Sequence, residues 1–297
     1  MTLRRTISCA LGLGALALVA GCGSRTREPV PPPPLAAAQE RVVDPVYAEA
    51  YAALRTFPTF GDNDPHDWVG GAPWVYPIHG VDVSRYQGVI DWAQLRTEGV
   101  SFAWIKSTEG GDHIDPEFET NWHAARQAGV RRGAYHFYYF CRTPEEQARW
   151  FIRNVPREAG SLPPVLDMEW NHASRNCKRR PSGAEVRAEA SRFLELIQAH
   201  YGRRPLIYTT VDFYRETGIG QLQGVDFWFR SVAGHPEDIY PGAHWVIWQY
   251  TGTGSVPGVK GNIDLNVFAG SAETWLHWLG YRKYLPMEPV VPVVQTN

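Results

Sequence analysis

Pro164-Val165-Leu166-Asp167-Met168-Glu169 is a short apolar run that carries two carboxylates near its end. Its length and its apolar residues are typical of a buried strand. A helical pattern precedes it at 143–154 and a longer one follows at 183–200. The first begins with a threonine, proline and glutamate signal, and the second carries an apolar stripe along one face. A strand between two helices predicts a parallel sheet with crossover helices.

The same alternation extends from this strand in both directions. Two more helical patterns lie upstream, at 91–97 and 116–127. Strand-like apolar runs occur at 78–84, 102–107, 133–140, 205–209, 227–232 and 244–250, with a last candidate at 262–266. Alternation over about 200 residues favours an α/β barrel of the TIM type, in a single domain. The links after Pro205 are shorter or irregular, so the closing half of the barrel need not repeat the regular unit.

Composition limits the classes of function. The chain has 297 residues, of which 44% are hydrophobic, enough for one large core. Its formal net charge of −2 argues against a nucleic-acid binder, which usually has a strong basic excess. The 12 tryptophans and 14 tyrosines fit either ordinary core packing or a carbohydrate groove, where ring faces pack on sugars.

The N-terminus predicts export. Arg4 and Arg5 precede an apolar stretch that is short for a membrane span and ends in Val19-Ala20-Gly21-Cys22. This pattern resembles a bacterial lipobox, so residues 1–22 are expected to be a lipoprotein signal peptide and Cys22 the site of lipidation. An ordinary secretory signal is the alternative. By the same resemblance, Gly23 favours the outer membrane, with the protein facing the periplasm.

Proline then marks a spacer. Residues 23–77 include Pro29 and the run at 31–34, which predicts an extended tether between the membrane and the domain. The catalytic barrel is expected at 78–280 and a C-terminal tail at 281–297. Because Cys9 leaves with the signal and Cys22 takes the lipid, Cys141 and Cys177 remain, and an oxidising compartment predicts a disulfide between them. Two buried free thiols are the alternative.

Acidic residues gather at the expected strand ends. Asp167 and Glu169 lie two positions apart, so their side chains face the same way. Burying two carboxylates together is costly unless their charges are used. One acid kept protonated and one kept ionised suit glycosidic cleavage. Asp82 and Asp264 lie at two other strand ends, so four carboxylates are expected at one rim of the barrel.

Several blocks, in order, carry a family resemblance. They are HGVDVSRYQG at 79–88 followed by IDW at 90–92, FAWIKSTEG at 102–110, GAYHF at 133–137, LDME at 166–169, WQYT at 248–251 and IDLNVF at 263–268. Together they resemble the glycoside hydrolase family 25 lysozymes, which are N-acetylmuramidases. The resemblance covers about residues 78–280.

This resemblance implies a fold, a substrate and roles. The family fold is an irregular (β/α)5(β)3 barrel. The implied substrate is peptidoglycan, cut at the β-1,4 bond between N-acetylmuramic acid and N-acetylglucosamine by a monomer without cofactor or metal. By analogy Glu169 is the general acid, Asp167 orients or stabilises the reacting centre, and Asp82 and Asp264 flank them. Further candidates for the sugar groove are Tyr135, Tyr208, Arg230, Trp248, Gln249 and Tyr250.

Some features leave alternatives open. Arg230 either engages an anionic part of the substrate or neutralises one of the acids. The basic insert at 171–181 is either a solvated loop or a contact for an anionic wall polymer. His79, Asp82, His136, Asp167 and Glu169 include the ligand types of a metal-dependent polysaccharide deacetylase, although no close-spaced histidine pair accompanies them. A non-catalytic wall-binding barrel is the remaining alternative.

Overall fold

The computed structural model describes residues 58, 60–69, 71–172 and 174–280. These residues belong to one compact unit. The expected signal peptide with Cys22, the tether up to residue 57 and the C-terminal tail lie outside the described residues.

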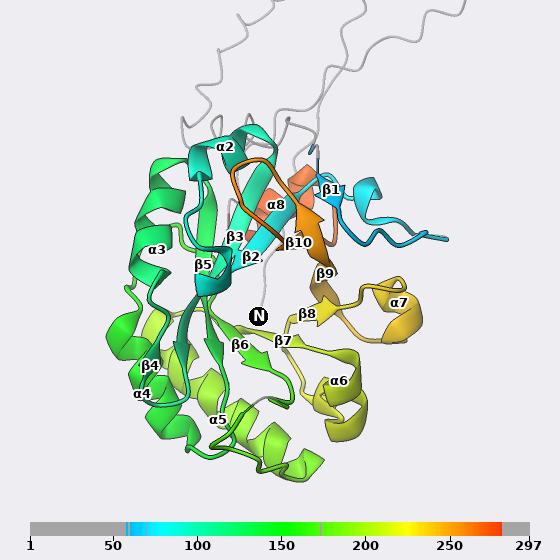
Figure 1. The fold of residues 1–297 in the computed structure, drawn as a ribbon. Helices are drawn as coiled ribbons and strands as arrows, with labels where there is room; N and C mark the ends of the chain where they lie inside the picture. The colour runs from blue at the N-terminus through cyan, green and yellow to red at the C-terminus, as the bar shows by residue number, and fades with distance from the viewer. Residues whose placement is uncertain (1–57, 59, 70, 173, 281–297) are drawn as a thin grey trace, which may run out of the picture. The chain divides into compact units, whose positions relative to one another are not determined.

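Within the described part of the chain, eight strands close into a barrel (Figure 1). The strands are β2 (His79–Val83), β3 (Val100–Glu109), β5 (Arg131–Phe137), β6 (Val165–Met168), β7 (Leu206–Thr209), β8 (Phe227–Arg230), β9 (Trp245–Ser255) and β10 (Ile263–Phe268). From β2 to β9 each pairs in parallel with its neighbour. The barrel closes through β10, which is antiparallel to both β9 and β2. The predicted α/β barrel is therefore confirmed.

Helices follow the first five barrel strands in turn: α2 (Trp92–Thr97), α3 (Phe118–Gln127), α4 (Pro144–Asn154), α5 (Gly183–Tyr201) and α6 (Val211–Thr217). Only the four-residue α7 (Pro236–Ile239) separates β8 from β9, and α8 (Ala272–Trp278) comes after β10. This is the (β/α)5(β)3 arrangement. The expected start of α4 is correct, since Thr143 and Glu146 form a reciprocal capping box. Among the described helices, none is both long and apolar enough to cross a membrane.

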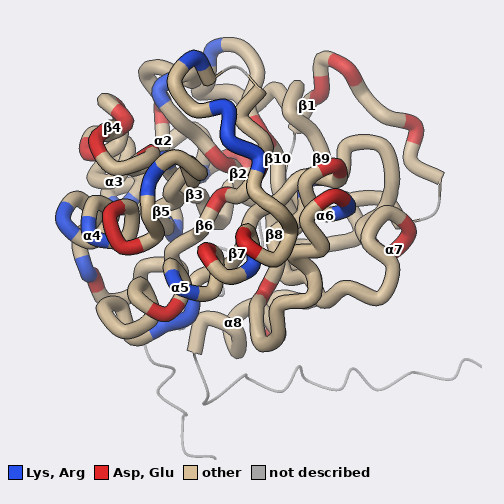
Figure 2. The backbone as a smooth tube through the Cα atoms, turned by 90° about the horizontal axis from the view of Figure 1, so that it is seen from below, with Lys and Arg blue, Asp and Glu red and all other residues tan. Residues whose placement is uncertain are grey.

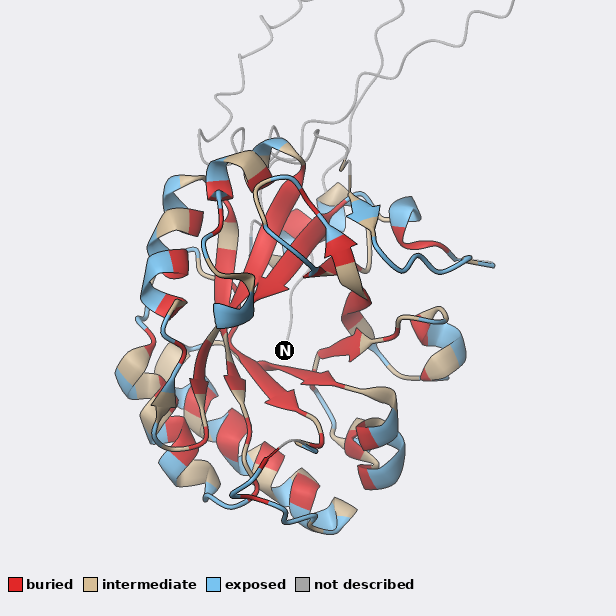
Figure 3. Ribbon diagram, in the orientation of Figure 1, coloured by how far each residue is buried: buried red, intermediate tan, exposed pale blue. Residues whose placement is uncertain are grey.

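Large side chains fill the inside of the barrel, and the strands are mostly buried (Figure 3). Phe102 and Trp104 of β3 belong to an interior cluster that α8 joins through Trp275. Gly80 and Gly133 on the neighbouring strands make room for these rings, because a Cβ atom at either position would lie within 2.4 Å of ring atoms. The interior is thus solid, and a cavity can open only near the strand ends.

Part of the expected tether packs on the barrel. The two-residue strand β1 (Gly61–Asp62) pairs with β9. Trp68 meets the ring of Trp248 edge-on at 5.0 Å, and Phe60 meets that of His79 at 5.7 Å. These rings cover the outer face of strands that have no long helix over them. The folded unit therefore begins before the expected boundary at residue 78.

Candidate active site

The four predicted acids line one cavity of about 310 Å³. Asp82, Asp167 and Glu169 come from the C-terminal ends of β2 and β6, and Asp264 comes from the start of the antiparallel β10. Acidic positions gather around the labels β2, β6 and β8 in Figure 2. Four other predicted residues line the same cavity: Tyr135, Tyr208, Arg230 and Gln249. The structure thus brings eight of the predicted site residues together around one cavity.

A buried hydrogen-bond chain holds Asp82. Its Oδ2 accepts one bond from Gln249 Nε2 and one from Asn266 Nδ2, both at 2.8 Å. Tyr208 donates its hydroxyl to Gln249 Oε1 at 3.0 Å, and Trp228 donates Nε1 to Asn266 Oδ1 at 2.8 Å. A second hydrogen bond thus orients the side-chain amide of Gln249 and that of Asn266, and the two amides hold the Asp82 carboxylate in position.

Asp167 differs from Asp82 in being poorly satisfied. Its side chain is buried, and Oδ1 has no hydrogen-bond partner within the described structure. Burial, followed by the charge of Glu169, raises the pKa of Asp167 well above its usual range. An unpaired buried carboxyl oxygen costs free energy.

Burial also raises the pKa of the other three acids. It brings the pKa of Glu169 to about 6, against the opposing charge of Arg230. The pKa of Asp82 also rises to about 6, although the bonds from its two amide donors lower it. Burial, followed by the charge of Asp82, raises the pKa of Asp264 to about 8. Near neutral pH the site can thus contain both protonated and ionised carboxyls, as acid catalysis requires.

Two predicted groove residues, Trp248 and Tyr250, do not reach the cavity. On β9 the side chains alternate, so Gln249 points into the barrel and its two neighbours point outward. Trp248 donates Nε1 to Ser231 O at 2.7 Å and packs against Trp68. The hydroxyl of Tyr250 lies 3.4 Å from Nδ1 of His79. The structure therefore places these two predicted sugar contacts outside the cavity, because neighbouring residues on a strand face opposite sides.

Strand parity also places the two candidate histidine ligands, His79 and His136, outside the cavity. His79 packs against Phe60 and Tyr250 on the outer side of β2. His136 lies between Thr108 and Gln147, to which its ring nitrogens bond, and stacks on Phe193 of α5. Within the described residues, no cluster of three or more histidine, cysteine or acidic side chains has the arrangement of a metal site.

Residues 81–259 match the model of the family described as glycosyl hydrolases family 25. The chain belongs to this family. It is 36% identical over 204 residues to Lysozyme M1 of Streptomyces globisporus, and the matched region covers 66% of this chain and 69% of the relative. It is also 36% identical, over 206 residues, to the protein YegX of Escherichia coli K12, and this match covers 68% of this chain and 73% of the relative.

Solved structures agree with this membership. A family 25 glycosyl hydrolase from Bacillus anthracis superposes with a TM-score of 0.65 at 36% identity, covering 73% of this chain and 98% of that chain. A lysozyme from Streptomyces coelicolor gives a TM-score of 0.61 at 34% identity, covering 69% of this chain and 98% of the other. The protein described here is thus a glycoside hydrolase with the family barrel.

Asp264 of this family 25 hydrolase lies beyond the matched range, which ends at residue 259. The tertiary structure nevertheless places Asp264 in the cavity, opposite Asp82 on the neighbouring strand. The fourth acid therefore belongs to the same site as the three inside the matched range.

Sequence reasoning missed six residues that line the cavity: Ser84, Tyr86, Gln87, Lys106, Phe137 and Trp228. Strand parity could have found four of them, since Ser84, Lys106, Phe137 and Trp228 each lie two positions from another inward-facing residue. Tyr86 and Gln87 lie on the short 3-10 helix η2 (Arg85–Gln87) after β2, where strand parity does not apply. Lys106 is already paired, because its Nζ lies 2.6 Å from Glu109 Oε2.

Proposed function

We propose that this family 25 hydrolase is a peptidoglycan muramidase that cleaves the β-1,4 bond between N-acetylmuramic acid and N-acetylglucosamine. The observation that carries the proposal is the pair Asp167 and Glu169, which enter one cavity from a single strand end together with Asp82 and Asp264. The relatives add support, because they include Lysozyme M1 and an N,O-diacetylmuramidase from Chalaropsis that is 31% identical over 144 residues.

Glu169 is the general acid in this proposal. With its pKa near 6, a useful fraction of the group carries a proton in mildly acidic and neutral solution. It gives this proton to the glycosidic oxygen as the bond breaks. Protonation makes the leaving sugar a neutral alcohol, and positive charge then develops on the other sugar ring.

Asp167 stabilises or orients that reacting centre. Asp167 lines the cavity, so its carboxyl group can accept an N–H from the substrate's acetamido group or face the developing cation. Asp82 contributes negative charge when it is ionised, whereas Asp264, with a pKa of about 8, is mostly protonated in this pH range. The fixed amides of Gln249 and Asn266 keep Asp82 in place while the substrate binds.

Product analysis tests the proposal. Protein containing residues 23–297 is incubated with purified peptidoglycan, and the new chain ends are identified by mass spectrometry. A muramidase leaves reducing N-acetylmuramic acid. Ends that are 1,6-anhydro sugars would indicate a lytic transglycosylase and contradict the proposal, and so would binding to the wall without any new ends.

A metal-dependent deacetylase predicts a different result. It would release acetate, leave the glycan chain uncut and lose activity in EDTA. Because the rings of His79 and His136 lie on the outer side of the barrel wall, we expect glycan cleavage to persist in EDTA.

We further propose that Cys22 anchors the protein, as a monomer, to the outer membrane on the periplasmic side. The support is the lipobox-like run before Cys22 and the proline-rich spacer after it. Labelling cells with a clickable fatty acid tests this anchor. The label should appear on the wild-type protein and be absent from Cys22→Ser.

A further inference from the structure

A second cavity, of about 230 Å³, shares Glu169 with the catalytic cavity. It lies under the insert that follows β6. Side chains that line it include Tyr139, Trp170, His172, Lys178, Arg179 and Arg180. Because Glu169 lines both cavities, a substrate whose glycosidic bond lies at Glu169 can extend a substituent into the second cavity.

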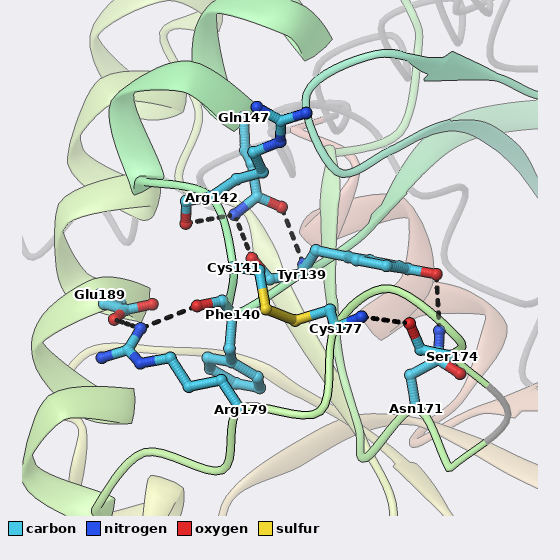
Figure 4. The surroundings of a disulfide bond; sticks show 10 residues. All are labelled: Tyr139, Phe140, Cys141, Arg142, Gln147, Asn171, Ser174, Cys177, Arg179 and Glu189. Atoms are coloured by element: carbon cyan, nitrogen blue, oxygen red, sulfur yellow. Dashed lines mark hydrogen bonds and ion pairs between the residues drawn. A yellow bond between two sulfur atoms is a disulfide. The ribbon is translucent and has the colours of Figure 1, made fainter.

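The insert is held against the barrel at several points (Figure 4). The Cys141–Cys177 disulfide joins it to the segment after β5, across 36 residues of chain. Asn171 donates Nδ2 to the hydroxyl of Tyr139 at 2.8 Å, and within the insert itself Cys177 N donates to Ser174 Oγ at 3.0 Å. The wall of this cavity is therefore built into the fold rather than formed by an untethered surface loop.

One of the three basic side chains has a structural role. Arg179 donates to Phe140 O and pairs with Glu189, both at 2.8 Å, and it also contacts Glu185 at 3.2 Å. Figure 4 shows Arg179 reaching from the insert to Phe140 and Glu189. Its charge is already neutralised by two carboxylates, so it fixes the insert and leaves ligand binding to its neighbours.

Arg180 and Lys178 are the cations available to a ligand. The Arg180 guanidinium lies 4.7 Å from the ring centre of Trp170, its Nη2 lies 3.0 Å from Nδ1 of His172, and its nearest carboxylate is Glu216 at 3.5 Å. Glu216 also accepts a closer bond from Trp170 Nε1 at 2.8 Å. In the described structure Lys178 is exposed and has no hydrogen bond or ion pair. A guanidinium held by several contacts, next to an exposed ammonium, suits a carboxylate ligand.

We propose that this second cavity binds a carboxylate of the peptide stem carried by the muramyl sugar at the cleaved bond. This inference rests on the proposed muramidase function. Peptide stems of peptidoglycan are anionic and branch from the muramyl residue, so a stem next to Glu169 lies within reach of Lys178 and Arg180. The two cations thus make the enzyme prefer glycan with charged stems over bare glycan.

The test compares three soluble substrates. They are glycan strands with intact stems, the same strands with their carboxylates converted to primary amides, and strands whose stems an amidase has removed and whose exposed lactyl carboxylates have then been converted to amides. The variants are Lys178→Gln, Arg180→Gln and the double variant. Arg175→Gln is the matched control, because Arg175 is an exposed arginine of the same insert that does not line the cavity.

On intact strands we expect KM of the double variant to rise about three- to tenfold, the usual effect of losing partly exposed charge-assisted contacts, with kcat unchanged. Arg175→Gln should equal wild type. On amidated and stem-free strands all four variants should match wild type. An unchanged KM on intact strands, or an equal loss on all three substrates, overturns the inference. Lys178→Gln alone keeps the test informative if replacing Arg180 disturbs the insert.

Binding separates this inference from the proposed function. In a Glu169→Gln background, affinity for intact strands is measured with and without Lys178→Gln and Arg180→Gln. If wild type cleaves none of the substrates, the muramidase proposal fails on its own. The cavity proposal fails separately if these two substitutions leave the affinity for intact strands unchanged.

Discussion

Asp82 and Asp264 are direct register partners across the antiparallel ladder between β2 and β10. Two acids at opposed positions repel one another when both are ionised. The charge of Asp82 is, after burial, the second cause that raises the pKa of Asp264, to about 8. The barrel closure thus brings together two like charges that a fold selected only for stability would avoid.

Replacing Asp264 with Asn should stabilise the protein at alkaline pH. The folded-state pKa values of Asp82 and Asp264, about 6 and about 8, lie above the ordinary value of 3.8. Between about pH 4 and 8 these two carboxyls therefore hold more protons in the folded protein than in the unfolded chain, and the stability that they contribute falls as pH rises through that window. We expect Asp264→Asn to gain about 1–3 kcal/mol at pH 8 in urea unfolding and to show a shallower decline.

The exposed residue Asp67 supplies the control for this prediction. Asp67→Asn should follow the wild-type curve of stability against pH. If the stability gap between Asp264→Asn and wild type does not widen from pH 5 to pH 8, the fold does not hold Asp264 protonated.

Glu169→Gln should remove glycan cleavage while keeping the fold. Loss of a general acid lowers kcat by about 10²–10⁴-fold. Reducing-sugar release from peptidoglycan measures the activity, and circular dichroism verifies the fold. Glu119→Gln, at an exposed position of α3, is the control and should keep full activity. Substantial cleavage by folded Glu169→Gln would move the acid role to another carboxyl.

Arg230 should set the alkaline limit of activity. Its positive charge lowers the pKa of Glu169, which burial raises to about 6. Because the general acid must be protonated, kcat/KM should fall as pH rises above about 6. In Arg230→Gln the pKa of Glu169 rises, so this limb should move to higher pH by about one unit, whereas Arg230→Lys should keep it near the wild-type position. A limb that does not move in Arg230→Gln contradicts this assignment.

Removing the hydroxyl of Tyr208 or of Tyr250 tests which of the two tyrosines contributes to the site. Tyr208 donates to Gln249 inside the cavity, and Tyr250 contacts His79 outside it. Tyr208→Phe should lower kcat/KM several-fold, because Gln249 loses the bond that orients it toward Asp82. Tyr250→Phe should keep wild-type kinetics with a stability change of about 1 kcal/mol. Equal kinetic losses in both variants would place Tyr250 in the substrate path after all.

Removing the disulfide should destabilise the protein. The bond closes a loop with a sequence separation of 36. On the chain-entropy model, Cys141→Ala with Cys177→Ala costs about 3–4 kcal/mol in denaturant unfolding under oxidising conditions. Arg179 still ties the insert to Glu189, so we expect the variant to fold. Equal stability of oxidised and reduced wild-type protein would contradict this cost.

Local pattern was enough to predict the barrel and most of its site. Alternating strands and helices require a parallel sheet, and parallel strands place their C-terminal ends at one rim. Asp82, Asp167 and Glu169 could thus be expected together from their positions alone. The same argument fails where parity was ignored, as at Trp248 and Tyr250, since neighbouring residues on a strand face opposite sides.

Amino-acid sequence by itself determined which strands carry acids and that Asp167 and Glu169 share one face, because strand periodicity is a local property. Tertiary structure alone decided the rest. Antiparallel closure by β10 set Asp264 opposite Asp82, packing of Phe60 and Trp68 moved the domain boundary upstream, and burial raised the pKa values. Each depends on contacts between residues far apart in the chain, which no local pattern records.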